Sequence, residues 1–229
     1  MTRRLYLLRH GQTEFNASRR MQGQLDTHLS QVGREQARTA AGYFHGQGIS
    51  KIISSDLMRA HDTALAVAEV CGLSVHTDER LRETNLGQWQ GKAAHEVDQH
   101  APGARAVWRH DPTWAPPEGE TRLEVAARAK AVVDEQMRSF DGWDEGGLLL
   151  VAHGGTLIAL TCALLNVPEG NYNMLTGLRN TRWAQLTAKP RFDPAAGVDA
   201  QPDQHFTAAT IADPQWQLDG WNLGEGFLE

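Results

Sequence analysis

Short apolar runs alternate along this chain with longer stretches in which apolar residues recur at helical spacing. Four runs have the length and composition of strands: 4–8, 51–55, 73–77 and 147–155. The last of these, GLLLVAHGG, is apolar almost throughout. Such a run is typical of a strand that is covered on both faces of a parallel sheet. The pattern therefore predicts strands separated by helices.

A predicted helix follows each apolar run except the third. The helices are expected over 30–46, 57–72, 121–140 and 156–165. Ser30 is the predicted N-cap of the first helix. Thr121 and Glu124 have the spacing of a capping box at the start of the third.

The strand–helix alternation predicts an α/β fold, a three-layer α/β/α arrangement with a mostly parallel central sheet. We expect one domain over residues 1–229. Residues 84–117, rich in tryptophan, histidine and proline, are expected to form an irregular, lid-like excursion. The polar, proline-containing stretch 189–214 is expected to be a surface connection. Two late edge strands are predicted at WAQLTA (183–188) and WQLDGWN (216–222).

Composition and charge narrow the function classes. The chain is 41% hydrophobic and 22% charged, with a net charge of −6 that is not concentrated in any block. This argues against nucleic acid or an anionic membrane as the main partner. No apolar stretch reaches the length of about 18 residues that a membrane span needs. Two cysteines in apolar contexts are expected to be free thiols, so we expect a cytoplasmic protein.

Charged side chains follow the ends of all four predicted parallel strands. Arg9 and His10 follow the first strand and Arg59 opens the helix after the second. Glu83 comes after the third strand and His153 after the fourth. Because ligands of open parallel sheets bind at the carboxyl ends of the strands, these five groups are expected to converge.

This set of groups suits phosphoryl chemistry. Arginines bind phosphate oxygens in a bidentate manner, an imidazole can act as the nucleophile, and a carboxylate can protonate the leaving alcohol. Each residue taken alone has an ordinary structural explanation. A metal site of two histidines and one carboxylate is the alternative, but two arginines at the same place would repel a divalent cation. The conjunction at matching strand ends favours the phosphoryl site.

Five motifs together resemble the histidine phosphatase superfamily, which has the phosphoglycerate mutase-like fold: LLRHGQTEFN (7–16), SSDLMRAHDTA (54–64), RLRETNLGQWQG (80–91), GET (119–121) and VAHGG (151–155). The resemblance implies that His10 becomes a phosphohistidine and that Glu83 donates the proton. It also implies phosphate binding by Arg9, Arg59 and His153. Further contacts to phosphate or substrate are implied for Thr13, Asn16, Gln22, Gly23 and Gly154. It implies no metal and no organic cofactor.

The same five active-site groups occur in mutases and in phosphatases of this family, so they do not distinguish the two activities. Mutases of this family carry a longer segment after the glutamate, whereas here the segment between Glu83 and Glu118 is short. A short lid admits water to the phosphohistidine, so hydrolysis of a small phosphorylated metabolite is favoured. A phosphoglycerate mutase-type phosphoryl transferase stays as an alternative. A binding module that has lost catalysis is disfavoured, because no expected catalytic group is missing.

The substrate prediction depends on the excursion. Residues 101–129 resemble the corresponding segment of actinobacterial family members that act on glucosyl-3-phosphoglycerate, and this implies the same substrate here. Alternatives are a broad-specificity phosphatase, or one acting on α-ribazole phosphate or phosphoproteins. The tryptophans of this region can stack on a sugar or pack the excursion onto the sheet: Trp89, Trp108 and Trp114. Its cations can meet a substrate carboxylate or form a solvated face: Arg105, Arg109 and His110. A homodimer that pairs along WAQLTA is expected by analogy.

Overall fold

A six-stranded sheet forms the centre of the computed structural model, which describes residues 2–193, 195 and 205–224. The strands are β1 (Arg3–Arg9), β2 (Ile49–Ser54), β3 (Val75–Thr77), β4 (Gly147–Ala152), β5 (Trp183–Lys189) and β6 (Gln215–Leu223). Their order across the sheet is β3-β2-β4-β1-β5-β6. β3, β2, β4 and β1 pair in parallel, and β5 pairs antiparallel with both β1 and β6. The predicted mostly parallel sheet is confirmed.

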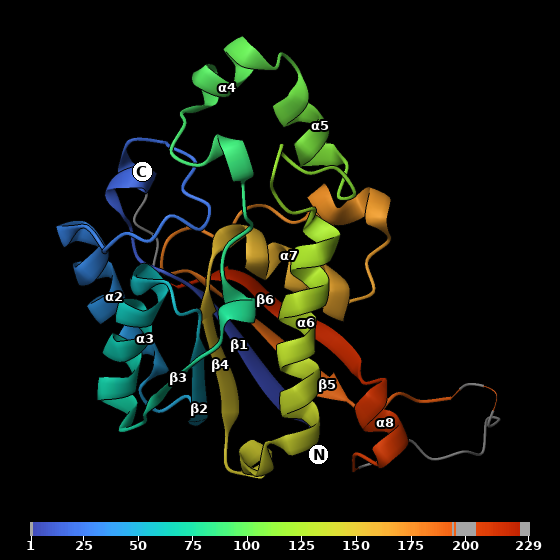
Figure 1. Cartoon of the computed structure of the whole chain (residues 1–229). Helices are drawn as coiled ribbons and strands as arrows, with labels where there is room; N and C mark the ends of the chain where they lie inside the picture. The colour runs from blue at the N-terminus through green and yellow to red at the C-terminus, as the bar shows by residue number, and fades with distance from the viewer. Residues whose placement is uncertain (1, 194, 196–204, 225–229) are drawn as a thin grey trace.

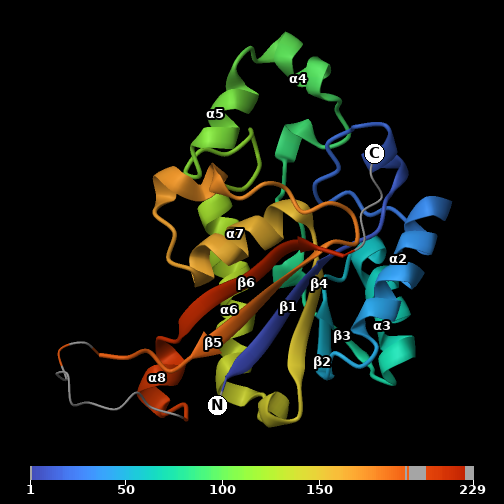
Figure 2. The same cartoon turned by 180° about the vertical axis from the view of Figure 1, so that it is seen from behind.

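Helices cover both faces of the sheet, as the predicted three-layer fold requires (Figures 1 and 2). α2 (Gln31–Phe44) and α3 (Met58–Cys71) pack on one face. α6 (Arg122–Ser139) and α7 (Gly154–Leu164) pack on the other. All six residues of β4 are buried, because this strand lies between two parallel neighbours and between both helical layers.

The ends of the helices follow the predicted signals. The Ser30 side chain accepts a hydrogen bond from the Gly33 amide and caps α2. Thr121 and Glu124 form the expected capping box at the start of α6. α3 ends at Gly72, whose φ of 67° is left-handed and favours glycine. Local sequence thus determines where these three helices begin or end.

Two predicted boundaries or roles are wrong. β4 ends at Ala152 rather than at residue 155, because His153 is already the N-cap of α7. WAQLTA is not at an edge, because β5 is paired on both sides; of the two late strands, β6 alone is an outer strand. Dimer pairing along β5 therefore has no free strand edge to use. The connection 189–214 contains α8 (Ala208–Ala212), and two of its apolar side chains pack on the core, Phe206 and Ile211. Residues 194 and 196–204 of that stretch lie outside the described residues.

The excursion over 84–117 is more ordered than expected. It contains η2 (Gly87–Trp89), α4 (Ala94–His100) and α5 (Ala104–His110), and it stands over the carboxyl ends of the parallel strands (Figure 1). Trp89 is buried in a small cluster with Leu86 and Val97. Its ring contacts those of Trp108 and Trp114 at centroid distances of 5.8 and 5.5 Å. The three tryptophans therefore pack the excursion together rather than onto the sheet, since no strand residue among the described ones belongs to this cluster. Their stacking on a sugar stays a prediction.

The remaining elements are short. They are α1 (Glu14–Ala17), η1 (Glu79–Leu81), η3 (Asp141–Asp144) and η4 (Glu169–Met174). Both cysteines are free thiols, as predicted: Cys71 is half-buried and Cys162 is buried. No helix among the described residues has the length and apolar character needed to cross a bilayer.

The central position of β4 predicts the cost of truncating it. Leu150 is fully buried, so Leu150→Ala should lower the free energy of unfolding by about 2–5 kcal/mol through lost apolar burial and an unfilled cavity. Urea unfolding followed by circular dichroism measures this. Leu65→Ala is the matched control, because this leucine of α3 is 47% exposed and should change stability by about 0.5 kcal/mol at most. Equal effects of the two substitutions would contradict the assignment of the core.

Candidate active site

The five predicted groups meet at the carboxyl ends of the parallel strands. Arg9 is the last residue of β1, and His10 follows it. Arg59 lies in the first turn of α3, after β2, and His153 caps α7, after β4. Glu83 follows η1, after β3. The His10 and His153 rings lie 5.2 Å apart between centroids, and both are buried.

The contacts of His10 determine its tautomer. Its Nδ1 lies 2.7 Å from the carbonyl oxygen of Gly11, which can only accept a hydrogen bond. Nδ1 therefore carries the proton in the neutral ring, and Nε2 keeps a free lone pair. Burial, and then the charges of Arg59 and Arg9, lower the pKa of His10 well below 6.5. The ring is therefore neutral at neutral pH, and its unprotonated Nε2 can act as a nucleophile.

The two arginines are anchored by backbone carbonyls. Arg59, which is 1% exposed, donates to Gly23 O at 2.8 Å and to Leu25 O at 2.9 Å. Arg9 donates to Leu178 O at 2.5 Å. Burial lowers the pKa of Arg59 to about 10, which leaves it charged at neutral pH. These contacts hold both guanidinium groups but leave the buried Nε of each without a partner among the described residues.

Three buried nitrogens at this place have no hydrogen-bond partner among the described residues. They are Arg9 Nε, Arg59 Nε and His153 Nδ1. An unpartnered buried polar group costs about 1–3 kcal/mol, so such groups are rare unless a ligand satisfies them. All three belong to residues predicted to bind phosphate. The cluster therefore has the donors and the positive charge for an oxyanion.

His153 is oriented by Ser55. Its Nε2 lies 2.9 Å from Ser55 Oγ, which also accepts from the Leu57 amide. When the serine hydroxyl donates to Nε2, the ring proton is on Nδ1, the unpartnered atom. Burial, and then the charges of Arg59, His10 and Arg9, lower the pKa of His153 well below 6.5. A neutral His153 can thus donate to the oxyanion from Nδ1.

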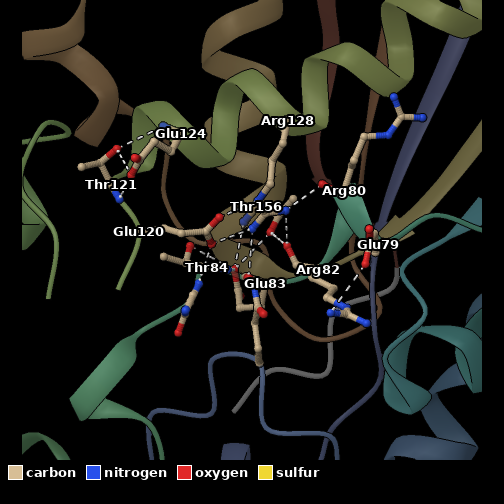
Figure 3. Close-up of polar contacts among 12 residues, drawn as sticks. Glu79, Arg80, Arg82, Glu83, Thr84, Glu120, Thr121, Glu124, Arg128 and Thr156 are labelled. Atoms are coloured by element: carbon tan, nitrogen blue, oxygen red, sulfur yellow. Dashed lines mark hydrogen bonds and ion pairs between the residues drawn. The ribbon is translucent and has the colours of Figure 1, made fainter. Parts of the chain in front are cut away.

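The Glu83 carboxylate lies at the N-terminus of α7 (Figure 3). It accepts from the amides of Gly155 and Thr156, both at 3.1 Å, and of Thr84 at 2.8 Å. A Cβ on Gly155 would lie 2.6 Å from Glu83 Oε1, so only glycine leaves room for the carboxylate. These amides hold the carboxyl group of Glu83 beside the phosphate-binding cluster.

The other predicted binding residues divide into two groups. Asn16 Oδ1 accepts from Thr13 N at 3.1 Å and from Asn180 Nδ2 at 3.2 Å, so its Nδ2 is the free donor. Gly154 lies at the start of α7 against the Arg9 guanidinium. The remaining three contact protein groups: the Thr13 hydroxyl bonds to Gln22, Gln22 also bonds to Thr27, and the Gly23 carbonyl holds Arg59. Their predicted contact with substrate stays a prediction.

Several supporting residues were missed by the sequence analysis. Asn180 follows η4 and donates to the carbonyl of His10 at 3.0 Å as well as to Asn16. Ser55 orients His153, and Thr156 contacts the Glu83 carboxylate through its hydroxyl at 3.3 Å. Ser55 lies within the motif SSDLMRAHDTA, and Thr156 directly follows VAHGG. Asn180 has no such signal, because only the pairing of β1 with β5 brings it to the site.

A free imidazole nitrogen beside two buried arginines is the arrangement of a phosphoryl-transfer enzyme with a histidine nucleophile. The family model of the histidine phosphatase superfamily (branch 1) matches residues 5–192, and the chain belongs to this superfamily of phosphatases.

Individual relatives are similar over nearly the whole chain. The glucosyl-3-phosphoglycerate phosphatase of Mycolicibacterium vanbaalenii is 48% identical over 224 residues, or 96% of this chain and 94% of the relative. A solved mycobacterial glucosyl-3-phosphoglycerate phosphatase in complex with VO3 is 45% identical and has a TM-score of 0.86. The alignment covers 97% of this chain and 100% of the chain in that structure. A probable phosphoglycerate mutase, GpmB of Yersinia pestis, is 39% identical over 169 residues, or 72% of this chain and 75% of the relative.

The lowered pKa values of both histidines can be tested directly. Between pH 8 and 5.5 the His10 and His153 rings should stay neutral, whereas an ordinary imidazole gains its proton near pH 6.5. Long-range proton–nitrogen NMR reports both the charge and the tautomer of each ring, and His10→Asn assigns the signals. A titration of either ring with a midpoint near 6.5 would contradict the electrostatic account of the site.

Proposed function

We propose that this protein hydrolyses glucosyl-3-phosphoglycerate to glucosylglycerate and phosphate through a phosphohistidine on His10. The observation that carries the proposal is the set of three unpartnered buried nitrogens around the free Nε2 of His10. A phosphoryl group is an oxyanion that meets these nitrogens and presents a phosphorus atom to the nucleophile.

In the first step His10 Nε2 attacks phosphorus and the ester P–O bond breaks. Arg9, Arg59 and His153 bind the equatorial oxygens, where negative charge is concentrated. The leaving alcohol oxygen takes a proton from Glu83, so that no free alkoxide forms. The products of this step are a phosphohistidine, an alcohol and a Glu83 carboxylate.

In the second step water replaces the alcohol. The Glu83 carboxylate takes one proton from the attacking water, a new P–O bond forms and the N–P bond breaks. Inorganic phosphate leaves, and Glu83 is protonated for the next cycle. The amides of Gly155 and Thr156 hold Glu83 in place through both steps. No step requires a metal, and the arginines would repel a divalent cation, so we propose metal-independent activity.

The substrate assignment is supported by the names of relatives that cover nearly the whole chain, including the excursion. A cavity of about 510 Å³ adjoins the cluster at Arg9 and Asn16, and its wall carries five more arginines: Arg19, Arg20, Arg105, Arg179 and Arg182. Arg182 is only 9% exposed and its guanidinium has no hydrogen bond or ion pair among the described residues. Two of the others already pair with carboxylates, Arg20 with Glu96 and Arg105 with Asp98.

This concentration of positive charge, in a chain with a net charge of −6, supports a substrate that carries a carboxylate besides its phosphate. The free cysteines suit a reducing compartment, which supports a cytoplasmic location. The mutase alternative is supported by a relative that matches a smaller share of the chain.

Phosphate release in EDTA tests the function. We expect a kcat/KM for glucosyl-3-phosphoglycerate at least about 10-fold above those for 3-phosphoglycerate and nitrophenyl phosphate, a preference worth about 1.4 kcal/mol. His10→Ala should abolish all three activities, because no other group can form the phosphoenzyme. Equal, slow hydrolysis of the three substrates would instead favour a broad-specificity phosphatase. Activity that requires a metal would contradict the mechanism.

The role of Glu83 predicts a dependence on the leaving group. Glu83→Gln should lower kcat/KM, which reports formation of the phosphohistidine, by roughly 10²–10⁴-fold on sugar or glycerate esters, whose alcohols need a proton to leave. The loss should be much smaller with nitrophenyl phosphate, because nitrophenolate leaves without a proton. Steady-state kinetics on both substrates measures this difference. Equal losses on both would assign the proton to another group.

A further inference from the structure

Arg128 of α6 lies outside the phosphate cluster and does not enter the mechanism above. Its side chain is only 19% exposed and makes five hydrogen bonds (Figure 3). Nη1 donates to the carbonyls of Arg80 and Arg82, both at 2.7 Å, and Nη2 donates to the carbonyl of Glu83 at 3.0 Å. Nε and Nη2 also donate to the two carboxylate oxygens of Glu120, at 2.9 and 3.0 Å. This one side chain therefore holds the backbone that carries the proposed acid.

The backbone at this point has few other restraints. β3 ends at Thr77 and η1 at Leu81, so Glu83 belongs to no helix or strand. The carbonyl of Glu83 has one further donor, Gln24 Nε2 at 3.0 Å, and that of Arg82 has the Thr156 hydroxyl at 2.8 Å. The position of the backbone that carries Glu83 thus depends on side chains, and Arg128 supplies three of these contacts.

Glu120 connects the same arginine to the base of the excursion. Its Oε2 accepts from the Asn85 amide at 2.7 Å, and its own amide donates to Asn85 O at 2.8 Å. A second pair of residues closes the base, where Gln88 N donates to Pro117 O at 2.9 Å. Gly119 permits this close approach, since a Cβ there would lie 2.6 Å from Asn85 O. The two ends of the excursion are therefore joined beside Glu83.

We propose that Arg128, with Glu120, is a positioning residue for proton transfer: it fixes Glu83 over the leaving oxygen and links the acid to the base of the excursion. This inference rests on the proposed function of Glu83. The chemistry requires arginine, because a planar guanidinium reaches two groups of acceptors at once, whereas a lysine ammonium is a point charge on a flexible stem.

A series of substituted phenyl phosphates and an alkyl phosphate tests the proposal without depending on the natural substrate. Arg128→Met should lower kcat/KM on nitrophenyl phosphate less than about 3-fold and on the alkyl ester roughly 10–100-fold, because only the second needs a well-placed acid to form the phosphohistidine. Arg128→Lys should resemble Arg128→Met, since it keeps the charge but not the five bonds. Lys130→Met is the matched control: it removes a cation and an ion pair, with Asp134, from the same helix and should leave the leaving-group slope unchanged.

A double variant separates positioning from general damage. In Glu83→Gln the acid is already lost, so adding Arg128→Met should give no further leaving-group-dependent loss. Additive losses would overturn the proposal, as would equal losses on all esters in a folded Arg128→Met or a wild-type slope in Arg128→Lys. Thermal unfolding checks that each variant is folded. Glu120→Gln offers a milder second variant, because an amide nitrogen replaces one of the two oxygens that accept from Arg128, and it should shift the slope in the same direction.

The two proposals fail in different experiments. If His10→Ala still hydrolyses nitrophenyl phosphate, the proposed function is wrong. If His10 is required but the leaving-group slope is the same in wild type and in folded Arg128→Met, the proposed function stands and the role of Arg128 is wrong.

Discussion

The constraint on which the rest of the site depends is the burial of positive charge without a full set of partners. Arg9 and Arg59 are held by carbonyls of Leu178, Gly23 and Leu25, and each keeps one buried nitrogen unpaired. Desolvation makes such an arrangement unfavourable in the absence of an anion. The free-energy cost of these unpaired nitrogens is offset when an oxyanion binds to them. The fold therefore favours binding of an anionic phosphoryl group at this place.

The same positive field determines the state of the neighbouring groups. It adds to burial in keeping His10 and His153 neutral, so that one can attack and the other can donate from Nδ1. Glu83 needs local support of its own because it lies on a segment without regular structure. The amides at the start of α7 hold its carboxylate, and Arg128 holds its backbone. Three kinds of contact therefore prepare the site. Burial and positive charge keep the nucleophile neutral, backbone carbonyls hold the arginines of the anion pocket, and amides with Arg128 position the acid.

Several features could be predicted because their cause is local. Ser30 and Thr121 cap helices through atoms within three residues along the chain, and the apolar run of β4 can be stable only in a buried parallel strand. Features that depend on pairing over long distances were predicted less well. β5 was expected at an edge, but β6 covers it, and the irregular segment after Glu83 forms α4 and α5 around a tryptophan cluster. Asn180 had no signal at all.

The sequence by itself determined the strand–helix alternation and the charged residues that follow each parallel strand. From these came the fold class and the convergence of five groups, because parallel strands end at a common edge. Only the tertiary structure decided which nitrogens remain unpaired, which tautomer His10 adopts, and that Arg128 reaches Glu83 from a helix far along the chain. The physical reason is that hydrogen-bond partners and desolvation are properties of the packed molecule, whereas periodicity and strand ends are properties of the chain.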